Sequence, residues 1–282
     1  MRSLINSDFK LGVLGGGQLG KMMAQVAQKW SLPLWVLDTD PAFPAGTIAH
    51  HFEPGSFKSE ADVLRFGRQV DVLTIEIEHV HIGALEQLQA EGKIIHPNPQ
   101  SLTIIKDKGL QKAFYQDKGL PTSDFQLFES GAALKAALEK GQVQYPFVQK
   151  TRTAGYDGKG VAVIRSAADL DKILPPACLI EPLVDIQKEL AVIVARNPSG
   201  AIKAYPPVEM VFHPEANLVE FLLCPARISA AIAEKAEAIA VAAIEAFDIC
   251  GLLAVELFLD TNDQILINEV APRPHNSGHH TI

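Results

Sequence analysis

The sequence predicts an α/β protein in which a doubly wound parallel sheet is followed by mixed α+β structure. The first hundred residues alternate short apolar runs with segments of helical periodicity, an order typical of parallel sheets covered by helices. The first apolar run ends in glycines that open the next helix, as nucleotide-binding turns of such sheets do. Near the C-terminus, LLAVELFLD and QILINEV flank Thr261-Asn262, which predicts an antiparallel hairpin.

The N-terminal region should end near residue 104. Its expected strands are LGVLGG, LPLWVLD, VDVLTIEIE and GKIIHPNP, and the helix QLGKMMAQVAQKW follows the first of them. SLTIIKDKGLQKAFYQDKG then reads as a helix that stops at Gly119, because Pro121 follows closely and cannot continue it.

Two further regions are expected, at residues 105–185 and 186–282. The first should hold the strands SDFQLFES, YPFVQK, VAVIRS and CLIEPLV with the helix AALKAALEK. The second should hold the strand KELAVIVAR, a long Ala-rich helix over 229–247 and the hairpin. No helix or strand is expected after the Gly/His-rich end, so we expect the protein to continue beyond it.

Composition narrows the class of protein. The chain has 282 residues, 48% of them hydrophobic, and a formal net charge of -8. An acidic chain without Lys/Arg clusters is a poor nucleic-acid binder, and neither a signal peptide nor a membrane span is evident. The cysteines Cys178, Cys224 and Cys250 form no CxxC pair, so we expect neither disulfides nor structural zinc, but a reducing cytoplasm.

Gly15 to Gly20 form a glycine turn that opens the first helix. Glycines let a phosphate approach the backbone, and the helix N-terminus offers free amides. Asp38 ends the second strand, near the spacing of an acid that contacts a ribose. The turn alone leaves a dinucleotide site open, although such glycines also serve packing, and the downstream motifs favour another nucleotide site.

TRTAGYDGKG, residues 151–160, is a second glycine-rich loop that lies between two expected strands. It combines three glycines with Arg152 and Lys159, and Lys150 stands just before it. Such a loop can fold over a triphosphate and offer amides and cations together. The alternative is a surface turn, which the density of charged and aromatic residues disfavours.

IEPLV, residues 180–184, ends a strand at a proline. Backbone released from pairing there can offer an amide and a carbonyl to an adenine edge, and Glu189 could take ribose hydroxyls. Taken alone, each acid in this stretch is more simply explained as a surface carboxylate.

Glu256 and Glu269 are acids in otherwise apolar strands, where unpaired carboxylates are costly. If the hairpin turns symmetrically on residues 261 and 262, Glu256 faces Ile267 and Glu269 is the diagonal neighbour on the same face. The two carboxylates and Asn268 could then gather around Mg²⁺. A one-residue change of register would break this assignment, and two solvent-facing acids are the alternative.

PRPHNSGHH, residues 272–280, concentrates a cation, imidazoles and amide donors. Clustered histidines can indicate zinc, but no Cys lies nearby and the spacing fits no helix-borne zinc motif. An anionic, hydrogen-bonding substrate fits this segment better.

In chain order these motifs resemble the ATP-grasp superfamily, and more closely its N5-carboxyaminoimidazole ribonucleotide synthetase family. The matching pieces are GVLGGGQLGKM, IEIEHV, NPQSLTIIKDKGLQK, GYDGKG, EPLV and INEVAPRPHNSGHH, so the likeness covers nearly the whole chain. It implies a Rossmann-like pre-ATP-grasp domain at 1–104, an ATP-grasp A subdomain at 105–185, and a B subdomain with the metal site at 186–282. It also implies a small C-terminal domain that this chain lacks.

The resemblance implies ATP-dependent carboxylation of 5-aminoimidazole ribonucleotide (AIR) by bicarbonate in purine biosynthesis. ATP would phosphorylate bicarbonate to carboxyphosphate, with Mg²⁺, or alternatively Mn²⁺, as the metal, and the protein would be a cytoplasmic homodimer. The metal ligands implied are Glu256 and Glu269. The ATP-binding residues implied are Lys108, Lys150, Gly155, Tyr156, Asp157, Gly158, Lys159, Gly160, Val161, Glu181, Pro182, Leu183, Val184, Glu189, Asn268 and Glu269.

The family pattern also implies the residues that handle the other substrates. Those near bicarbonate and carboxyphosphate, and so catalytic, are Tyr156, Asp157, Lys159 and Arg273. Those expected to bind AIR are Gly17, Gln18, Leu19, Glu76, His79, Arg273, His275 and Asn276.

Three alternatives stay open on the sequence. The first is another ATP-grasp ligase, such as a formate-dependent glycinamide ribonucleotide transformylase or a biotin carboxylase. The second is a fragment that binds ATP without turnover, and the third is a dehydrogenase that uses the first glycine turn. Acceptor assays and NAD(P)H binding separate them.

Overall fold

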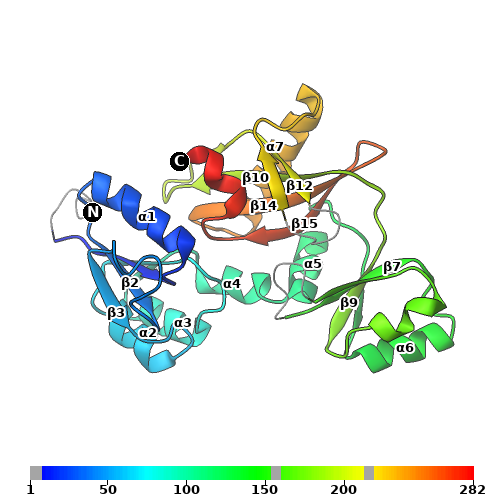
Figure 1. Ribbon diagram of the computed structural model, residues 1–282, viewed down its shortest axis with the longest axis horizontal. Coiled ribbons are helices and arrows are strands. Elements are labelled where there is room, and N and C mark those ends of the chain that lie inside the picture. The colour runs from blue at the N-terminus through cyan, green and yellow to red at the C-terminus, as the bar shows by residue number, and fades with distance from the viewer. Residues whose placement is uncertain (1–7, 154–159, 213–218) are drawn as a thin grey trace.

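The computed structural model describes residues 8–153, 160–212 and 219–282, and these fold into three sheets linked by helices (Figure 1). The strands of the N-terminal sheet are β1 (Leu11–Leu14), β2 (Leu34–Asp38), β3 (His51–Pro54), β4 (Val72–Ile75) and β5 (Ile94–Ile95). All pair in parallel, in the order β3-β2-β1-β4-β5, which confirms the predicted doubly wound sheet. The sequence pattern missed β3, a short edge strand whose residues are only partly buried.

Helices cover both faces of this sheet: α1 (Gln18–Lys29), α2 (Glu60–Gly67) and α3 (Ile82–Ala90). Ser59 and His81 cap α2 and α3 by accepting hydrogen bonds from free amides. α1 begins after Gly17 without a capping side chain from that residue, so its first amides can bind other groups. Fully buried apolar residues such as Phe66 and Leu85 pack beneath the sheet and hold the turn after β1 on a rigid base.

The single helix expected after this sheet is two helices, α4 (Pro99–Ile105) and α5 (Lys108–Asp117). The Asp107 carboxylate accepts hydrogen bonds from the Gly109 and Leu110 amides, which starts a new helix and ends the old one. α5 stops before Gly119, which adopts a left-handed conformation, as the sequence predicted. The break places Lys108 at the first position of α5, from where its side chain reaches Glu269.

The middle sheet is antiparallel and contains β6 (Gln126–Phe128), β7 (Phe147–Thr151), β8 (Val161–Ile164) and β9 (Cys178–Pro182). Their order is β6-β9-β7-β8. A helix, α6 (Gly131–Glu139), and a 3-10 helix, η1 (Ala167–Lys172), accompany the sheet. Leu134 of α6 is buried in one cluster with Phe147 and Ile164, so this small layer has its own core.

The third sheet has the order β13-β12-β10-β14-β15, with β11 beside β10. Its longest helix packs with α5 in a single buried cluster that includes Tyr115, Leu190, Ile244 and Ile267. Among the described helices, none is both long and apolar enough to cross a membrane. The elements are β10 (Ile186–Arg196), β11 (Ile202–Ala204), β12 (Val208–Phe212), β13 (Val219–Leu223), α7 (Ala230–Ala246), β14 (Gly251–Asp260), β15 (Ile265–Ala271) and η2 (Asn276–Thr281).

The register of the β14–β15 hairpin differs from the symmetric one expected. Glu256 pairs with Glu269 rather than with Ile267. Next to the turn, Leu259 pairs with Ile265, whereas a symmetric turn would pair it with Gln264, so the register is shifted by one residue. A bulge between Glu256 and Leu257 leaves Asn268 without a partner in the ladder and shifts the register by one more residue. The total shift of the register is two residues. Because side chains of a strand alternate between the two faces of the sheet, a shift of two residues leaves Glu256 and Glu269 on the same face.

Near its C-terminal end the polypeptide returns to the N-terminal region, and η2 packs against β10. Arg273, just after β15, forms an ion pair with Glu78, whose segment follows β4, with Nε 3.0 Å from Oε1. The segments that follow β4 and β15 are therefore in direct contact.

Candidate functional site

Lys150 lies at the centre of a polar cluster between the middle and third sheets. Its ammonium donates to Glu181 Oε2 at 3.1 Å and to Asn268 Oδ1 at 2.8 Å. Lys150 pairs with Leu179 in the β7–β9 ladder, so Glu181 is its diagonal neighbour on the same sheet face. Because Lys150 and Glu181 are buried, each charge needs the other, and the ammonium is held in a defined position.

Lys112 of α5 completes the neutralisation of Glu181. Its Nζ lies 2.9 Å from Glu181 Oε1. Burial acts to raise the pKa of Glu181, but the ammonium groups of Lys150 and Lys112 outweigh it and lower that pKa. Burial lowers the pKa of Lys112 to about 8, since little of its side chain reaches water. Glu181 is therefore a carboxylate that serves two cations.

Two further charge pairs lie on the hairpin face. The Lys108 ammonium, at the start of α5, donates to Glu269, and His275 Nε2 lies 3.3 Å from Glu256 Oε1. Burial would lower the pKa of Lys108 and raise that of Glu269, but their mutual attraction reverses both shifts. The two hairpin acids thus face each other, and each has a basic partner.

Glu189 lies next to this acidic pair, on β10 opposite Phe258 of β14. Burial, and then repulsion from the Glu256 carboxylate, raise the pKa of Glu189 to about 7. A carboxyl group near its midpoint at neutral pH can either donate or accept a hydrogen bond. This fits a group that would meet ribose hydroxyls.

Glu256, Glu269 and Asn268 supply oxygen atoms of the type that Mg²⁺ prefers. Within the described ranges, no group of three or more His, Cys, Asp or Glu side chains is arranged to hold a metal ion. Mg²⁺ is commonly bound by one or two carboxylates together with substrate phosphates and water. The donor set therefore fits a metal that arrives with a nucleotide.

The N-terminal glycine turn is shaped by carboxylates. Gly16 N donates to Asp38 Oδ2 at 2.7 Å, and a Cβ on Gly17 would lie 2.8 Å from Glu76 Oε1. Burial raises the pKa of Glu76, while hydrogen bonds from the Gly20 and Leu19 amides act to lower it. The Glu76 carboxyl group therefore faces the α1 N-terminus, and a phosphate expected at Gly17–Leu19 would meet it there.

Two of the predicted AIR-binding residues, Glu76 and Arg273, come from opposite ends of the chain and interact here. Arg273 acts on the Glu76 carboxyl group electrostatically and pairs with Glu78. His79 belongs to the same segment, and burial lowers its pKa. His275 caps η2, and its Nδ1 lies 2.8 Å from Ser277 Oγ. Among the predicted AIR-binding residues, Gln18 and Asn276 are exposed to solvent.

The glycine-rich loop is only partly described. Gly155, Tyr156, Asp157, Gly158 and Lys159 lie outside the described residues. Gly160 accepts a hydrogen bond from the Thr151 amide, and Val161 begins β8.

Arg152, which the sequence suggested as a cation for a triphosphate, instead forms a bidentate pair with Asp107. On the side that faces β6, the pairing of β9 ends at Ile180, whereas Glu181 and Pro182 still pair with β7 on the other side. The β6 side of β9 beyond Ile180 belongs to the segment where the sequence predicts adenine. The expected ATP-binding residues are Pro182, which ends β9, and Leu183 and Val184, which come directly after this strand.

Sequence reasoning missed Lys112 and Thr122. Lys112 lies four residues after Lys108, so both project from the same face of α5, and this spacing was the available signal. Thr122 gave no signal, because its role depends on a contact with Ile267 that is 145 residues away.

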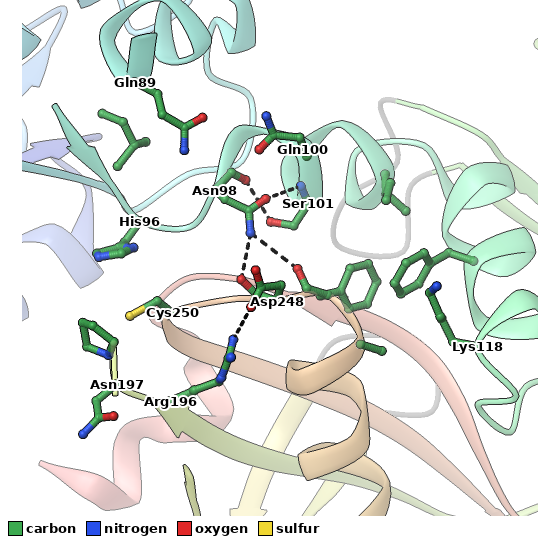
Figure 2. Close-up of a pocket in the computed structure, with 16 residues that line it drawn as sticks. Gln89, His96, Asn98, Gln100, Ser101, Lys118, Arg196, Asn197, Asp248 and Cys250 are labelled. Carbon is green, nitrogen blue, oxygen red and sulfur yellow. Dashed lines mark hydrogen bonds and ion pairs between the residues drawn. The ribbon is translucent and has the colours of Figure 1, made fainter. Parts of the chain in front are cut away.

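A separate pocket of about 670 Å³ lies between the end of α3, α4 and the end of α7 (Figure 2). Its polar groups are largely used within the protein: Asn98 Nδ2 donates to the Asp248 carbonyl at 2.9 Å, and Arg196 pairs with the Asp248 carboxylate at 2.6 Å. No predicted site residue lines it. The pocket lies at the interface between the N-terminal region and the third sheet.

Two family models match the chain. The model for the ribonucleotide synthetase preATP-grasp domain matches residues 9–106, and the model for the ATP-grasp domain matches residues 113–282. Together with the three sheets and the charged cluster between them, these matches define an ATP-grasp protein with a preceding pre-ATP-grasp domain, as predicted.

Relatives narrow the class. Phosphoribosylaminoimidazole carboxylase of Candida glabrata is 36% identical, covering 96% of this chain and 48% of that protein. N5-carboxyaminoimidazole ribonucleotide synthase of Synechococcus elongatus is 35% identical, covering 96% of this chain and 69% of that protein. The chain belongs to the N5-carboxyaminoimidazole ribonucleotide synthase family. It spans about half the length of the fungal and plant carboxylases that it matches.

Solved structures agree with this assignment. N5-carboxyaminoimidazole ribonucleotide synthetase from Thermotoga maritima superposes with a TM-score of 0.87 at 38% identity, covering 97% of this chain and 71% of that one. The Aspergillus clavatus synthase, crystallised with ADP and 5-aminoimidazole ribonucleotide, gives a TM-score of 0.89 at 34% identity, covering 98% and 73%.

Proposed function

We propose that this protein uses ATP and bicarbonate to carboxylate the exocyclic amine of AIR, giving N5-carboxyaminoimidazole ribonucleotide, ADP and phosphate in purine biosynthesis. The observation that carries the proposal is the position of Lys150. Its buried ammonium lies in one cluster with Asn268, which neighbours Glu269 on the hairpin. A phosphate-binding cation beside oxygen ligands for a divalent metal is what phosphoryl transfer requires. Relatives that carry this name or bind ADP and AIR support it.

ATP would bind between the middle sheet and the hairpin. The backbone of Glu181 to Val184 would hold adenine, and Glu189 would take the ribose hydroxyls. Lys108 and Lys150 would hold phosphate oxygens, with Gly155 to Val161 closing over them. Both ammonium groups already neutralise carboxylates, so they are positioned before the ligand arrives.

The metal site would consist of Glu256 and Glu269 with Asn268 alongside. The bound Mg²⁺ or Mn²⁺ would neutralise charge on the transferring phosphoryl group. Lys108 and His275 pair with these carboxylates in the structure, and they would have to share them. The Lys108 ammonium lowers the pKa of Glu269, which keeps that acid ionised for a metal.

In the reaction, a bicarbonate oxygen attacks the γ-phosphorus of ATP and ADP leaves, giving carboxyphosphate. The AIR amine then attacks the carboxyl carbon, phosphate leaves, and the amine loses a proton. Tyr156, Asp157, Lys159 and Arg273 would handle the bicarbonate and carboxyphosphate. AIR itself would bind Arg273, His275 and Asn276, together with Glu76, His79 and the turn Gly17, Gln18 and Leu19.

Acceptor dependence tests this proposal. ADP release should require bicarbonate and increase when AIR is added. ADP release that instead requires formate and glycinamide ribonucleotide would overturn it in favour of a transformylase. If the protein binds ATP but releases no ADP with either set of substrates, the chain contains a nucleotide-binding site without the ligase activity.

We also propose a cytoplasmic homodimer, and a division into domains at 1–104, 105–185 and 186–282. The three division ranges each hold one of the three sheets. The free cysteines Cys178, Cys224 and Cys250 suit a reducing compartment. Light scattering of the purified protein tests the dimer, and a monomeric mass would exclude it.

A further inference from the structure

A closed ring of polar contacts lies behind the proposed phosphate site. Lys112 and Lys150 bind the two different oxygens of the Glu181 carboxylate, at 2.9 and 3.1 Å. Lys112 also donates to Thr122 Oγ1 at 2.6 Å, and that hydroxyl donates to the Ile267 carbonyl at 3.0 Å. The ring closes because Asn268, the next residue, accepts from Lys150. Its members are Lys112, Glu181, Lys150, Asn268, Ile267 and Thr122.

The ring ties together elements that must keep a fixed distance if ATP is to bind between them. Lys150 and Glu181 belong to the middle sheet, Ile267 and Asn268 to the third sheet, and Lys112 to α5. The Ile267 amide also donates to the Pro121 carbonyl at 2.8 Å, so the Thr122 segment is itself paired with β15. The ring therefore sets the position of Lys150 relative to the hairpin that carries the acids.

Lys112 is too deeply buried to meet a nucleotide, since its side chain is 3% exposed and lies behind Glu181. Its effect must pass through its partners. An ammonium has three N–H donors, and Lys150 uses two of them on Glu181 Oε2 and Asn268 Oδ1. Because Lys112 occupies Glu181 Oε1, that oxygen does not compete for the third donor of Lys150, which remains for a phosphate oxygen.

We propose that Lys112 is a positioning residue, which aims Lys150 at the nucleotide phosphates through Glu181 and through the Thr122 contact with β15. This inference rests on the proposed nucleotide site. The ring as a whole carries two ammonium groups and one carboxylate, and this excess of positive charge suits a polyphosphate.

Comparing ADP with adenosine tests the role. With Lys112→Met, the dissociation constant for ADP should rise about tenfold, the effect of weakening one charge-assisted hydrogen bond, whereas that for adenosine should stay within about twofold. Adenosine has no phosphate for Lys150 to hold, so general damage to the pocket would weaken both ligands and overturn the proposal. Lys118→Met, which changes an exposed lysine just after α5, is the matched control and should change neither constant.

A double-mutant cycle separates action through Lys150 from any other effect. If Lys112 acts through Lys150, Lys112→Met/Lys150→Met should bind ADP no more weakly than Lys150→Met alone. Additive losses would overturn the proposal. If Lys112→Met fails to fold, Thr122→Val opens the ring with little change of volume and should raise the ADP constant by a few fold while leaving adenosine unchanged; unchanged ADP affinity would overturn the proposal.

The two hypotheses fail differently. Absence of ADP binding to the unmodified chain would reject the proposed nucleotide site. Normal ADP binding to the unmodified chain, together with equal ADP affinity in Lys112→Met, would reject only the role of Lys112.

Discussion

Glu256 and Glu269 face each other directly across the β14–β15 ladder. The pairing depends on the bulge at Asn268, because in a regular ladder Asn268 would face Glu256 and the Glu269 side chain would lie on the opposite face of the sheet. Like charges opposite each other destabilise a ladder, and here the Lys108 ammonium offsets that repulsion at Glu269, while His275 Nε2 lies 3.3 Å from Glu256 Oε1. The fold therefore holds two carboxylates close together, and without a nearby positive charge their repulsion would destabilise the hairpin.

The metal assignment predicts that Glu256→Gln/Glu269→Gln loses most of the Mg²⁺-dependent part of ADP binding. We expect at least about a tenfold weaker ADP affinity in Mg²⁺, and little change when EDTA is present. Titration calorimetry with and without the metal measures both. Glu245→Gln, at an exposed position on α7, is the control, and an intact Mg²⁺ effect in the double variant would contradict the assignment.

Glu189 should make stability dependent on pH. Its pKa is about 7 in the fold against an ordinary value of 4.5, so the folded protein binds more protons than the unfolded chain between these values. Stability from this group is therefore present below about pH 4.5 and is lost as the pH rises to about 7. Without ligand or metal, Glu189→Gln should unfold a few degrees higher than the unmodified protein at pH 8. The difference should vanish near pH 4.5, and thermal scans that show no such convergence would refute the shift.

Asp107 should matter more than an ordinary helix cap. It caps α5 and also binds Arg152 through two guanidinium nitrogens, whereas Ser130 only caps α6. Ser130→Ala should cost about 1 kcal/mol. Asp107→Ala should cost more, because it also leaves a half-buried guanidinium without its carboxylate. Urea unfolding of both variants measures the difference, and equal losses would show that the Arg152 pair contributes nothing.

Arg273 should affect AIR binding but not ADP binding. Its guanidinium contacts Glu78 at the junction with the N-terminal region, whereas Lys150 contacts Glu181 and Asn268. Arg273→Lys keeps the charge but removes the planar fork, so AIR affinity should fall by about tenfold with ADP affinity unchanged. Arg196→Lys, at the separate pocket of Figure 2, is the matched control. Loss of ADP affinity in Arg273→Lys would mean that the residue supports the whole site instead.

The periodicity and order of the helices and strands, and the types of residue at the site, could be predicted from the amino-acid sequence. Alternating apolar runs predicted the parallel sheet, and acids within apolar strands indicated Glu256 and Glu269. These signals are local, because strand and helix periodicity depend on near neighbours in the chain.

The contacts between those residues could not be predicted, because they depend on the packing of segments that are far apart in the chain. The helix break at Asp107, the bulge at Asn268 and the pairing of Arg152 with Asp107 depend on individual hydrogen bonds. Lys112 looked like any lysine on a helix until packing brought it to Glu181, on a strand far along the chain. Burial then makes that contact matter, since a charge removed from water must find its partner inside the fold.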